Sequence, residues 1–101
     1  MATLTKALFR GAATTNTATT LYTVPSSTTT VVTNILVVNN AGSTATFELL
    51  LDDVSIAKTI VIAANDTISI DLKQVLTAAK TIKGLASATT INFHISGVEI
   101  S

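Results

Sequence analysis

The sequence predicts an all-β protein, an antiparallel β-sandwich or jelly roll of about seven to eight short strands. Segments rich in Val, Ile, Leu and Thr recur through the 101 residues, and turn-forming residues separate them. Such side chains favour an extended, pleated backbone. Residues 67–72 also alternate strictly between polar and apolar side chains, which is typical of a strand with one buried and one hydrated face. Residues 1–101 are therefore expected to form a single β-sandwich domain.

Residues 1–20 are expected to form an N-terminal strand or arm, followed by an Ala/Thr-rich loop. Leu4 and Leu8 mark a loose alternation at the start, whereas residues 11–20 contain no large side chain to bury. A short strand over residues 21–24 follows, and it ends before a proline, which has no N–H to donate to a sheet.

The central stretch, residues 28–53, is predicted to hold the two middle strands of a sheet. Residues 31–38 are almost wholly β-branched or aliphatic, and residues 44–51 alternate again. Between them, residues 39–43 (Asn-Asn-Ala-Gly-Ser) tolerate the left-handed conformations of a chain reversal. The pattern favours a β-hairpin that forms the central pair of the sheet.

The second half of the chain contains further strands and turns. Asp52-Asp53 and residues 63–66 are expected to form turns on either side of a strand over residues 54–62. Residues 81–85 also have an extended pattern. Residues 73–79 are ambiguous, because their apolar side chains fall at the spacing of one or two helical turns across an end of the sheet.

The last predicted strand covers residues 91–100. Its apolar side chains change parity at Gly97, which is what a β-bulge produces. With this strand in place, the predicted core consists of the inward-facing side chains Val31, Ile35, Val37, Phe47, Leu49, Ile60, Ile62, Ile68, Ile70, Ile91, Phe93 and Ile95.

The central strands carry apolar side chains on both faces, whereas a two-layer sandwich buries only one face of each sheet. Val32, Leu36 and Val38 form the second face of their strand, and Leu50 and Val61 do so on neighbouring strands. An exposed apolar patch of roughly several hundred Å² usually marks an interface. These five residues are therefore expected at a subunit interface. The alternative is that the N-terminal arm folds over them.

Composition argues against several classes of partner. Charged residues make up 12% of the chain, against about 25% in an average soluble domain, and the formal net charge is zero. The six basic residues form no stripe for nucleic acid, and no apolar run approaches the roughly 20 residues that span a membrane. The absence of cysteine excludes disulfides and thiolate metal sites. Without a signal-peptide core, synthesis in the cytoplasm is expected.

No set of residues predicts catalysis, a cofactor or a metal ion. His94 is the only histidine and has no cysteine beside it, so an ordinary surface or interface role is expected. Asp52 and Asp53 match no calcium-loop spacing, and a turn explains both. A hydrolase that uses Asp66 or His94 would need paired carboxylates across a cleft, or a glycine-flanked serine, and neither is recognisable. The sequence therefore favours a protein that is not an enzyme.

Several segments, taken in order, resemble a group of small β-sandwich virion structural proteins of tailed bacteriophages and prophages. These segments are Phe9-Arg10-Gly11, Leu21 to Pro25, Val31 to Asn39, Asn65-Asp66-Thr67 and Ser96 to Ile100. The resemblance implies a protein that decorates the head or belongs to the neck or tail, usually as an oligomer and often as a trimer. The sequence departs from the group at Ala78-Ala79-Lys80, where a turn with Gly and Asp is expected.

The favoured function is that of a non-enzymatic structural protein of a phage particle, located in the virion. It would act through homo-oligomeric assembly, with a trimer favoured, and through contact with other virion structural proteins. The alternative is a receptor- or carbohydrate-binding module of a virion or cell-surface fibre, with Asn39, Asn40 or Asp52 contacting the ligand. The presence of only one Tyr and three Phe, without Trp, argues against that alternative.

Overall fold

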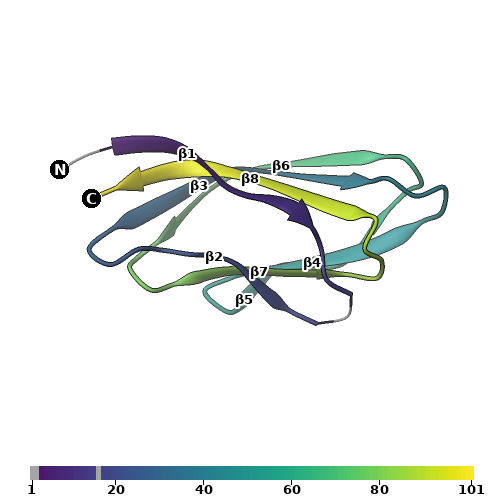
Figure 1. Cartoon of the computed structure of the whole chain (residues 1–101), viewed down its shortest axis with the longest axis horizontal. Coiled ribbons are helices and arrows are strands. Elements are labelled where there is room, and N and C mark those ends of the chain that lie inside the picture. The colour runs from purple at the N-terminus through teal and green to yellow at the C-terminus, as the bar shows by residue number, and fades with distance from the viewer. Residues whose placement is uncertain (1–2, 16) are drawn as a thin grey trace.

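Eight antiparallel strands form two four-stranded sheets in the computed structural model, which describes residues 3–15 and 17–101. Sheet A has the strand order β1-β8-β3-β6, and sheet B has the order β2-β7-β4-β5 (Figure 1). The predicted all-β sandwich is confirmed. The strands are β1 (Thr3–Ala12), β2 (Thr19–Thr23), β3 (Thr29–Asn39), β4 (Ala45–Leu51), β5 (Val54–Ile62), β6 (Thr67–Leu76), β7 (Thr81–Ala86) and β8 (Ile91–Ile100).

The strand topology is that of a jelly roll. The strands pair in a nested pattern, β1 with β8, β2 with β7, β3 with β6 and β4 with β5. The chain is thus one long antiparallel hairpin whose tip is the turn between β4 and β5. Two further pairings, β3 with β8 and β4 with β7, join the nested pairs into two sheets. An eight-stranded, two-sheet arrangement of this kind defines the jelly roll.

The predicted hairpin between β3 and β4 is wrong. These two strands lie in different sheets, each in an inner position, so residues 40–44 cross from one sheet to the other. The buried side chain of Asn39 fixes this arch. Its amide nitrogen donates to the carbonyls of Ser43 (2.9 Å) and Ala63 (3.2 Å), and its oxygen accepts from the N–H of Ala41 (3.0 Å).

Two local predictions for the second half of the chain have different outcomes. The Asp52-Asp53 turn is confirmed, because both residues adopt the left-handed region with φ of 54° and 61°. Aspartate is among the residues favoured at such positions in a two-residue hairpin turn. Residues 73–79 do not form a helix, since β6 continues through Leu76 and a turn containing Ala79 (φ 70°) follows.

The core lies between the two sheets, where Phe47 and Phe93 meet edge to face with ring centroids 6.2 Å apart. Ile68 and Ile70 are only partly buried against this core. Ile60 stays 38% exposed, and Val31 is half-buried, so these two predicted core positions are wrong. The other eight predicted core residues are buried: Ile35, Val37, Phe47, Leu49, Ile62, Ile91, Phe93 and Ile95.

Irregular pairing beside Gly97 explains why Val32 is buried in place of Val31. The pairing of β3 with β8 skips Thr33, and the pairing of β1 with β8 skips Leu8. In β3, buried positions are therefore even-numbered before Thr33 and odd-numbered after it. The bulge predicted in β8 lies instead in its two neighbours. Gly97 sits between them, and a Cβ there would overlap the carbonyl of Val31.

Candidate assembly surface

The five residues expected at a subunit interface do not form one patch. Val32 has no exposed surface, so its assignment to an outer face is wrong. Leu36 and Val38 are half-buried on the outer face of sheet A, whereas Leu50 is half-buried on the opposite outer face, that of sheet B. Val61 is 63% exposed on β5, where it pairs with an outward-facing residue of β4. For these four residues an interface role stays a prediction.

The outer face of sheet A is only weakly apolar around β3. Leu36 is level with His94 on one side and Ser69 on the other. The N-terminal segment does not fold over this face, because β1 is the edge strand of sheet A and lies beside β8. The alternative in which an arm covers the second face is therefore wrong.

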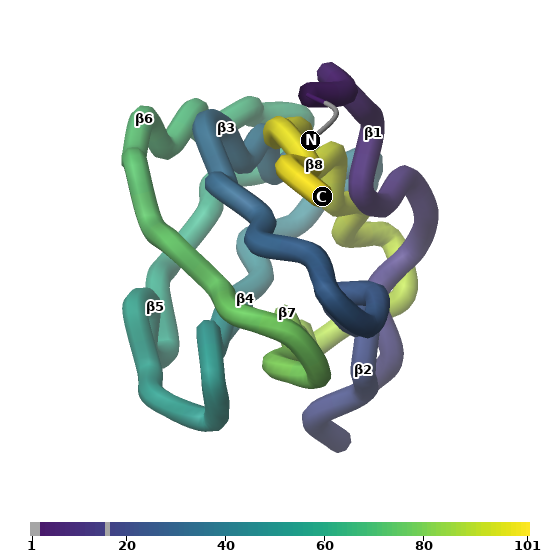
Figure 2. Tube along the Cα trace, turned by 90° about the vertical axis from the view of Figure 1, so that its left-hand side faces the viewer, coloured from purple at the N-terminus to yellow at the C-terminus, as the bar shows by residue number. Residues whose placement is uncertain are grey.

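Exposed apolar side chains gather instead on one side of the sandwich, along the edge strands β5 and β6, which lie one above the other in Figure 2. Of the six large hydrophobic residues that are exposed in the described part of the chain, four lie on β5 and one on β6. Three inward-pointing residues of β6 are also only partly covered. We call this the open side, and its apolar residues are Ile56, Ile60, Val61, Ile68, Ile70, Leu72 and Val75; Val54, at the β4–β5 turn, is not counted with them.

The opposite side, where β1 lies over β2, is closed (Figure 2). Ala13 is 3% exposed, and its N–H donates to the carbonyl of Ile91 at 2.8 Å. The carbonyl of Thr14 in turn accepts from the N–H of Ala86 at 3.0 Å. The Ala/Thr-rich segment predicted to be a loop thus connects sheet A to sheet B through backbone hydrogen bonds. Its residue Asn16 lies outside the described residues.

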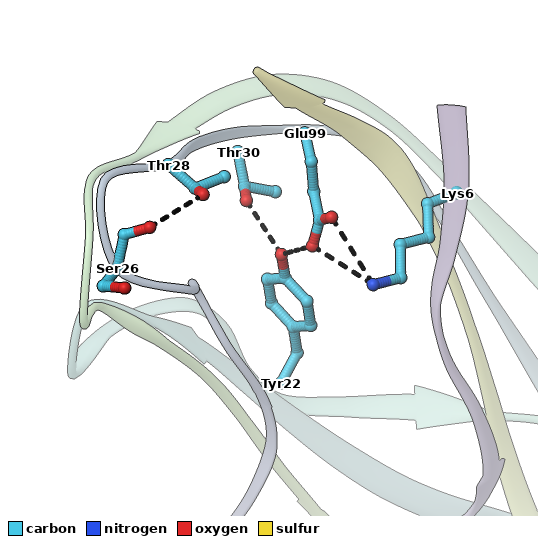
Figure 3. Close-up of polar contacts among 6 residues, drawn as sticks. All are labelled: Lys6, Tyr22, Ser26, Thr28, Thr30 and Glu99. Carbon is cyan, nitrogen blue, oxygen red and sulfur yellow. Dashed lines mark hydrogen bonds and ion pairs between the residues drawn. The ribbon is translucent and has the colours of Figure 1, made fainter. Parts of the chain in front are cut away.

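A polar cluster also links the two sheets on the closed side (Figure 3). The hydroxyl of Tyr22 in β2 donates to the carboxylate of Glu99 in β8 and lies 2.9 Å from the hydroxyl of Thr30 in β3. The Nζ atom of Lys6 in β1 is 3.4 Å from the same carboxylate. Burial above all, together with the hydrogen bond to Glu99, raises the pKa of Tyr22 to about 12. We call these four side chains the latch.

Most charged side chains are paired within the chain. The four ion pairs are Lys6–Glu99, Lys58–Glu48, Lys80–Asp52 and Lys83–Asp53. Among the described residues, the remaining charged side chains, those of Arg10, Asp66, Asp71 and Lys73, form no ion pair. Arg10 lies on β1, whereas the other three lie on β6 or directly before it. The charges that remain for a partner are thus divided between two opposite edges of sheet A.

The polar residues considered for catalysis are distributed over the surface. His94 is half-buried on the outer face of sheet A, level with Arg10 and Leu36. Asp66 lies in the loop before β6, where its carboxylate accepts from the N–H of Thr67 at 2.8 Å. The described residues contain no group of three or more His, Cys, Asp or Glu side chains that could hold a metal ion. They also contain no helix long and apolar enough to cross a membrane.

Comparison with known proteins gives a match only among solved structures. No protein-family model matches the chain, and no curated protein sequence does. Two of the matching structures are of a pentameric capsid protein isolated from metagenomic phage sequences. They are 18% and 21% identical to this chain, cover 96% of it and superpose with a TM-score of 0.40. The chain spans only 59% and 60% of the length of these two proteins.

Proposed function

We propose that this chain is a non-enzymatic structural protein of a phage particle, which acts by associating with copies of itself and with other virion proteins. The observation that carries the proposal is the open side, where apolar side chains remain exposed along two unpaired edge strands. Long apolar edges are an aggregation hazard for a free monomer, and burial against a neighbour removes that hazard. The resemblance of the sequence to small phage virion proteins supports the same function.

The subunit is compact before it associates. Its accessible surface is 5213 Å², close to the roughly 5,400 Å² expected for a folded monomer of this mass. Association would therefore join folded subunits and would not complete an unfinished fold. Such a unit suits capsid decoration or a place in the neck or tail, and the resemblance favours a trimer.

The mass of the protein in solution tests this proposal. We expect light scattering and sedimentation velocity of the full chain to give a constant mass of two or more times the 10.4 kDa chain mass, across a tenfold range around micromolar concentration. A particle that carries the labelled chain, imaged by cryo-electron microscopy, should show it on the head, neck or tail. A species of 10.4 kDa at every concentration contradicts the proposal.

A second candidate function, binding of a receptor or a carbohydrate, is favoured by the loops at one end of the sandwich. Asn39 ties three of these loops together, because it contacts Ser43, Ala63 and Thr90 within 3.5 Å. Ordered loops at the end of a sandwich are common binding sites. Asn40 is exposed there, but Asp52 lies at the far end of β4, so the two cannot contact one small ligand.

A glycan array separates this second function from the first. If the loop end binds sugar, the wild-type chain should bind specific glycans, Asn40→Ala should lose that binding, and Asp52→Ala should keep it. Absence of binding by the wild-type chain contradicts the second function and leaves the first untouched.

A further inference from the structure

We propose that copies of this chain associate side by side through two different edges, with the β1 edge of sheet A in one copy against the β6 edge of sheet A in the next. This inference rests on the proposed function, because it specifies the surface through which copies associate. It follows from one pair of opposite charges, and from one exposed apolar residue on each of two opposite edges of one sheet.

The ionic pair consists of Arg10 and Asp71, which lie at opposite edges of sheet A and at nearly the same height. Arg10 is level with His94, His94 with Leu36, and Leu36 with Ser69 of β6. Asp71 follows Ser69 by two residues, a distance of roughly 7 Å along a strand. Side chains that lie opposite each other in a ladder share a face. Both charged groups therefore belong to the outer face of the sheet.

Both charges are available to a partner. Arg10 is exposed and forms no ion pair with the described residues. Asp71 accepts one hydrogen bond, from the amide of Asn34 at 3.1 Å. It lines an open hollow of about 500 Å³ beside β6, together with Thr33, Leu72 and Lys73. A guanidinium group that enters the hollow can donate two N–H bonds to the carboxylate.

The apolar pair consists of Leu4 on β1 and Val75 on β6. They are 56% and 63% exposed and are the large hydrophobic residues left exposed in the described part of sheet A. Thr5, adjacent to Leu4, is level with Val75 through Val98 and Val31. Leu4 itself is level with the buried Leu76, through Glu99 and Thr30, and so belongs to the inner face of the sheet, whereas Val75 belongs to the outer face. A neighbour placed one sheet width away therefore brings the two residues to adjacent levels of one edge contact, on opposite faces of the joined sheets. The same displacement brings Arg10 close to Asp71.

Strand directions agree with this arrangement. Three successive antiparallel pairings separate β1 from β6, so these two edge strands run in opposite directions. A rotation about an axis parallel to the strands keeps those directions, and β1 of one copy then meets β6 of the next as an antiparallel neighbour. Contacts between two different surfaces form rings when the rotation closes. The closed side of each copy would cover Ile60 and Ile70 on the open side of its neighbour.

Charge reversal tests the ionic contact. Arg10→Glu and Asp71→Arg should each weaken self-association by at least about tenfold in sedimentation velocity, because like charges then face each other. The double variant Arg10→Glu/Asp71→Arg should recover association close to that of the wild-type chain. For the apolar contact, Val75→Ser should weaken association, whereas Val54→Ser should not, although Val54 is equally exposed at 65% against 63%. Thermal unfolding of each variant checks that it is folded.

Each outcome decides one point. If the wild-type chain associates and neither single reversal changes the association, the contact between the β1 and β6 edges is overturned and the proposed function stands. If the single reversals weaken association and the double variant does not recover it, the pairing of Arg10 with Asp71 is overturned. A monomeric wild-type chain overturns the proposed function and this inference together.

Discussion

The closed and open sides of the sandwich join the same two sheets in different ways. On the closed side, the backbone of residues 13–14 and the latch connect sheet A to sheet B, and Tyr22 is only 9% exposed. On the open side, Ile60 is 38% exposed, and within the described residues no side-chain hydrogen bond or ion pair joins β5 to β6. The difference indicates that the closed side stabilises the subunit, whereas the open side is free to bind.

The strongest test of this contrast is Gly97→Ala, next to the closed side. A Cβ at this position would overlap the carbonyl of Val31 and stand 2.9 Å from Cδ1 of Leu8. Because backbone must move to make room, we expect a loss of about 3 kcal/mol or more in the free energy of unfolding. Urea unfolding followed by circular dichroism measures this loss.

The matched control is Gly42→Ala, since a Cβ there has no neighbour within 4 Å. It should change the free energy of unfolding by less than about 0.5 kcal/mol. A similar loss in both variants would show that the cost comes from the removal of glycine itself and not from the contact with β3 and β1.

Removal of the latch hydroxyl by Tyr22→Phe should have the next largest effect. The Thr30 hydroxyl, in a residue with no exposed surface, and the Glu99 carboxylate would lose their shared partner. We expect a loss of about 1–3 kcal/mol at neutral pH. Urea unfolding gives the value, and an unchanged midpoint would show that the latch does not hold the closed side.

The same hydroxyl should make stability depend on pH in the alkaline range. The pKa of Tyr22 is about 12 in the folded chain and 10.0 as the ordinary value, so the fold favours the neutral phenol. This contribution is complete below pH 10 and is lost as the pH rises to about 12. Roughly 2–3 kcal/mol of stability should disappear over that interval in the wild-type chain. Tyr22→Phe should show a correspondingly flatter profile.

A substitution of Val by Thr at two positions compares the core with the open side. Val32 has no exposed surface, so Val32→Thr buries a hydroxyl and should cost about 1–2 kcal/mol. Val61 is 63% exposed, so Val61→Thr should change the free energy of unfolding by less than about 0.5 kcal/mol. Equal losses in the two urea titrations would mean that Val32 and Val61 do not differ in burial as described.

Ile60→Thr should have a small effect on the stability of the subunit and a larger effect on association. Ile60 is already 38% exposed, so the loss in unfolding free energy should stay below about 1 kcal/mol. Sedimentation velocity should nevertheless show weaker association, because this side chain would be buried between copies. A variant that loses stability but associates normally would contradict the assignment of the open side as a binding surface.

The positions of most strands were predictable from the sequence, whereas the partners of these strands were not. β-branched runs and turn residues mark strands locally, and the turn at Asp52-Asp53 is confirmed for that reason. The turn-forming residues after Asn39 suit a hairpin within one sheet as well as an arch between two sheets. Contacts with residues far along the chain favour the arch, among them the hydrogen bond from the Asn39 amide to the carbonyl of Ala63 at 3.2 Å.

Several features of the fold depend on contacts between residues far apart in the chain. Whether Val31 or Val32 is buried depends on the irregular pairing at Thr33, opposite Gly97. The latch joins Tyr22 to Glu99, 77 residues away. The exposure of the open side follows from which strands become edges, and local patterns of hydrophobicity do not encode that choice.

The nested pairing of the jelly roll also sets an order of events in time. β4 meets β5 across a two-residue turn, whereas β1 can meet β8 only when nearly the whole chain is present. Pairings between distant segments form slowly, so the closed side should be completed last. In pulse-labelled hydrogen exchange during refolding, the amides of β4 and β5 should gain protection before those of β1 and β8. A ribosome-bound chain would therefore lack the closed side until β8 emerges, and the strand edges left unpaired until then would favour aggregation.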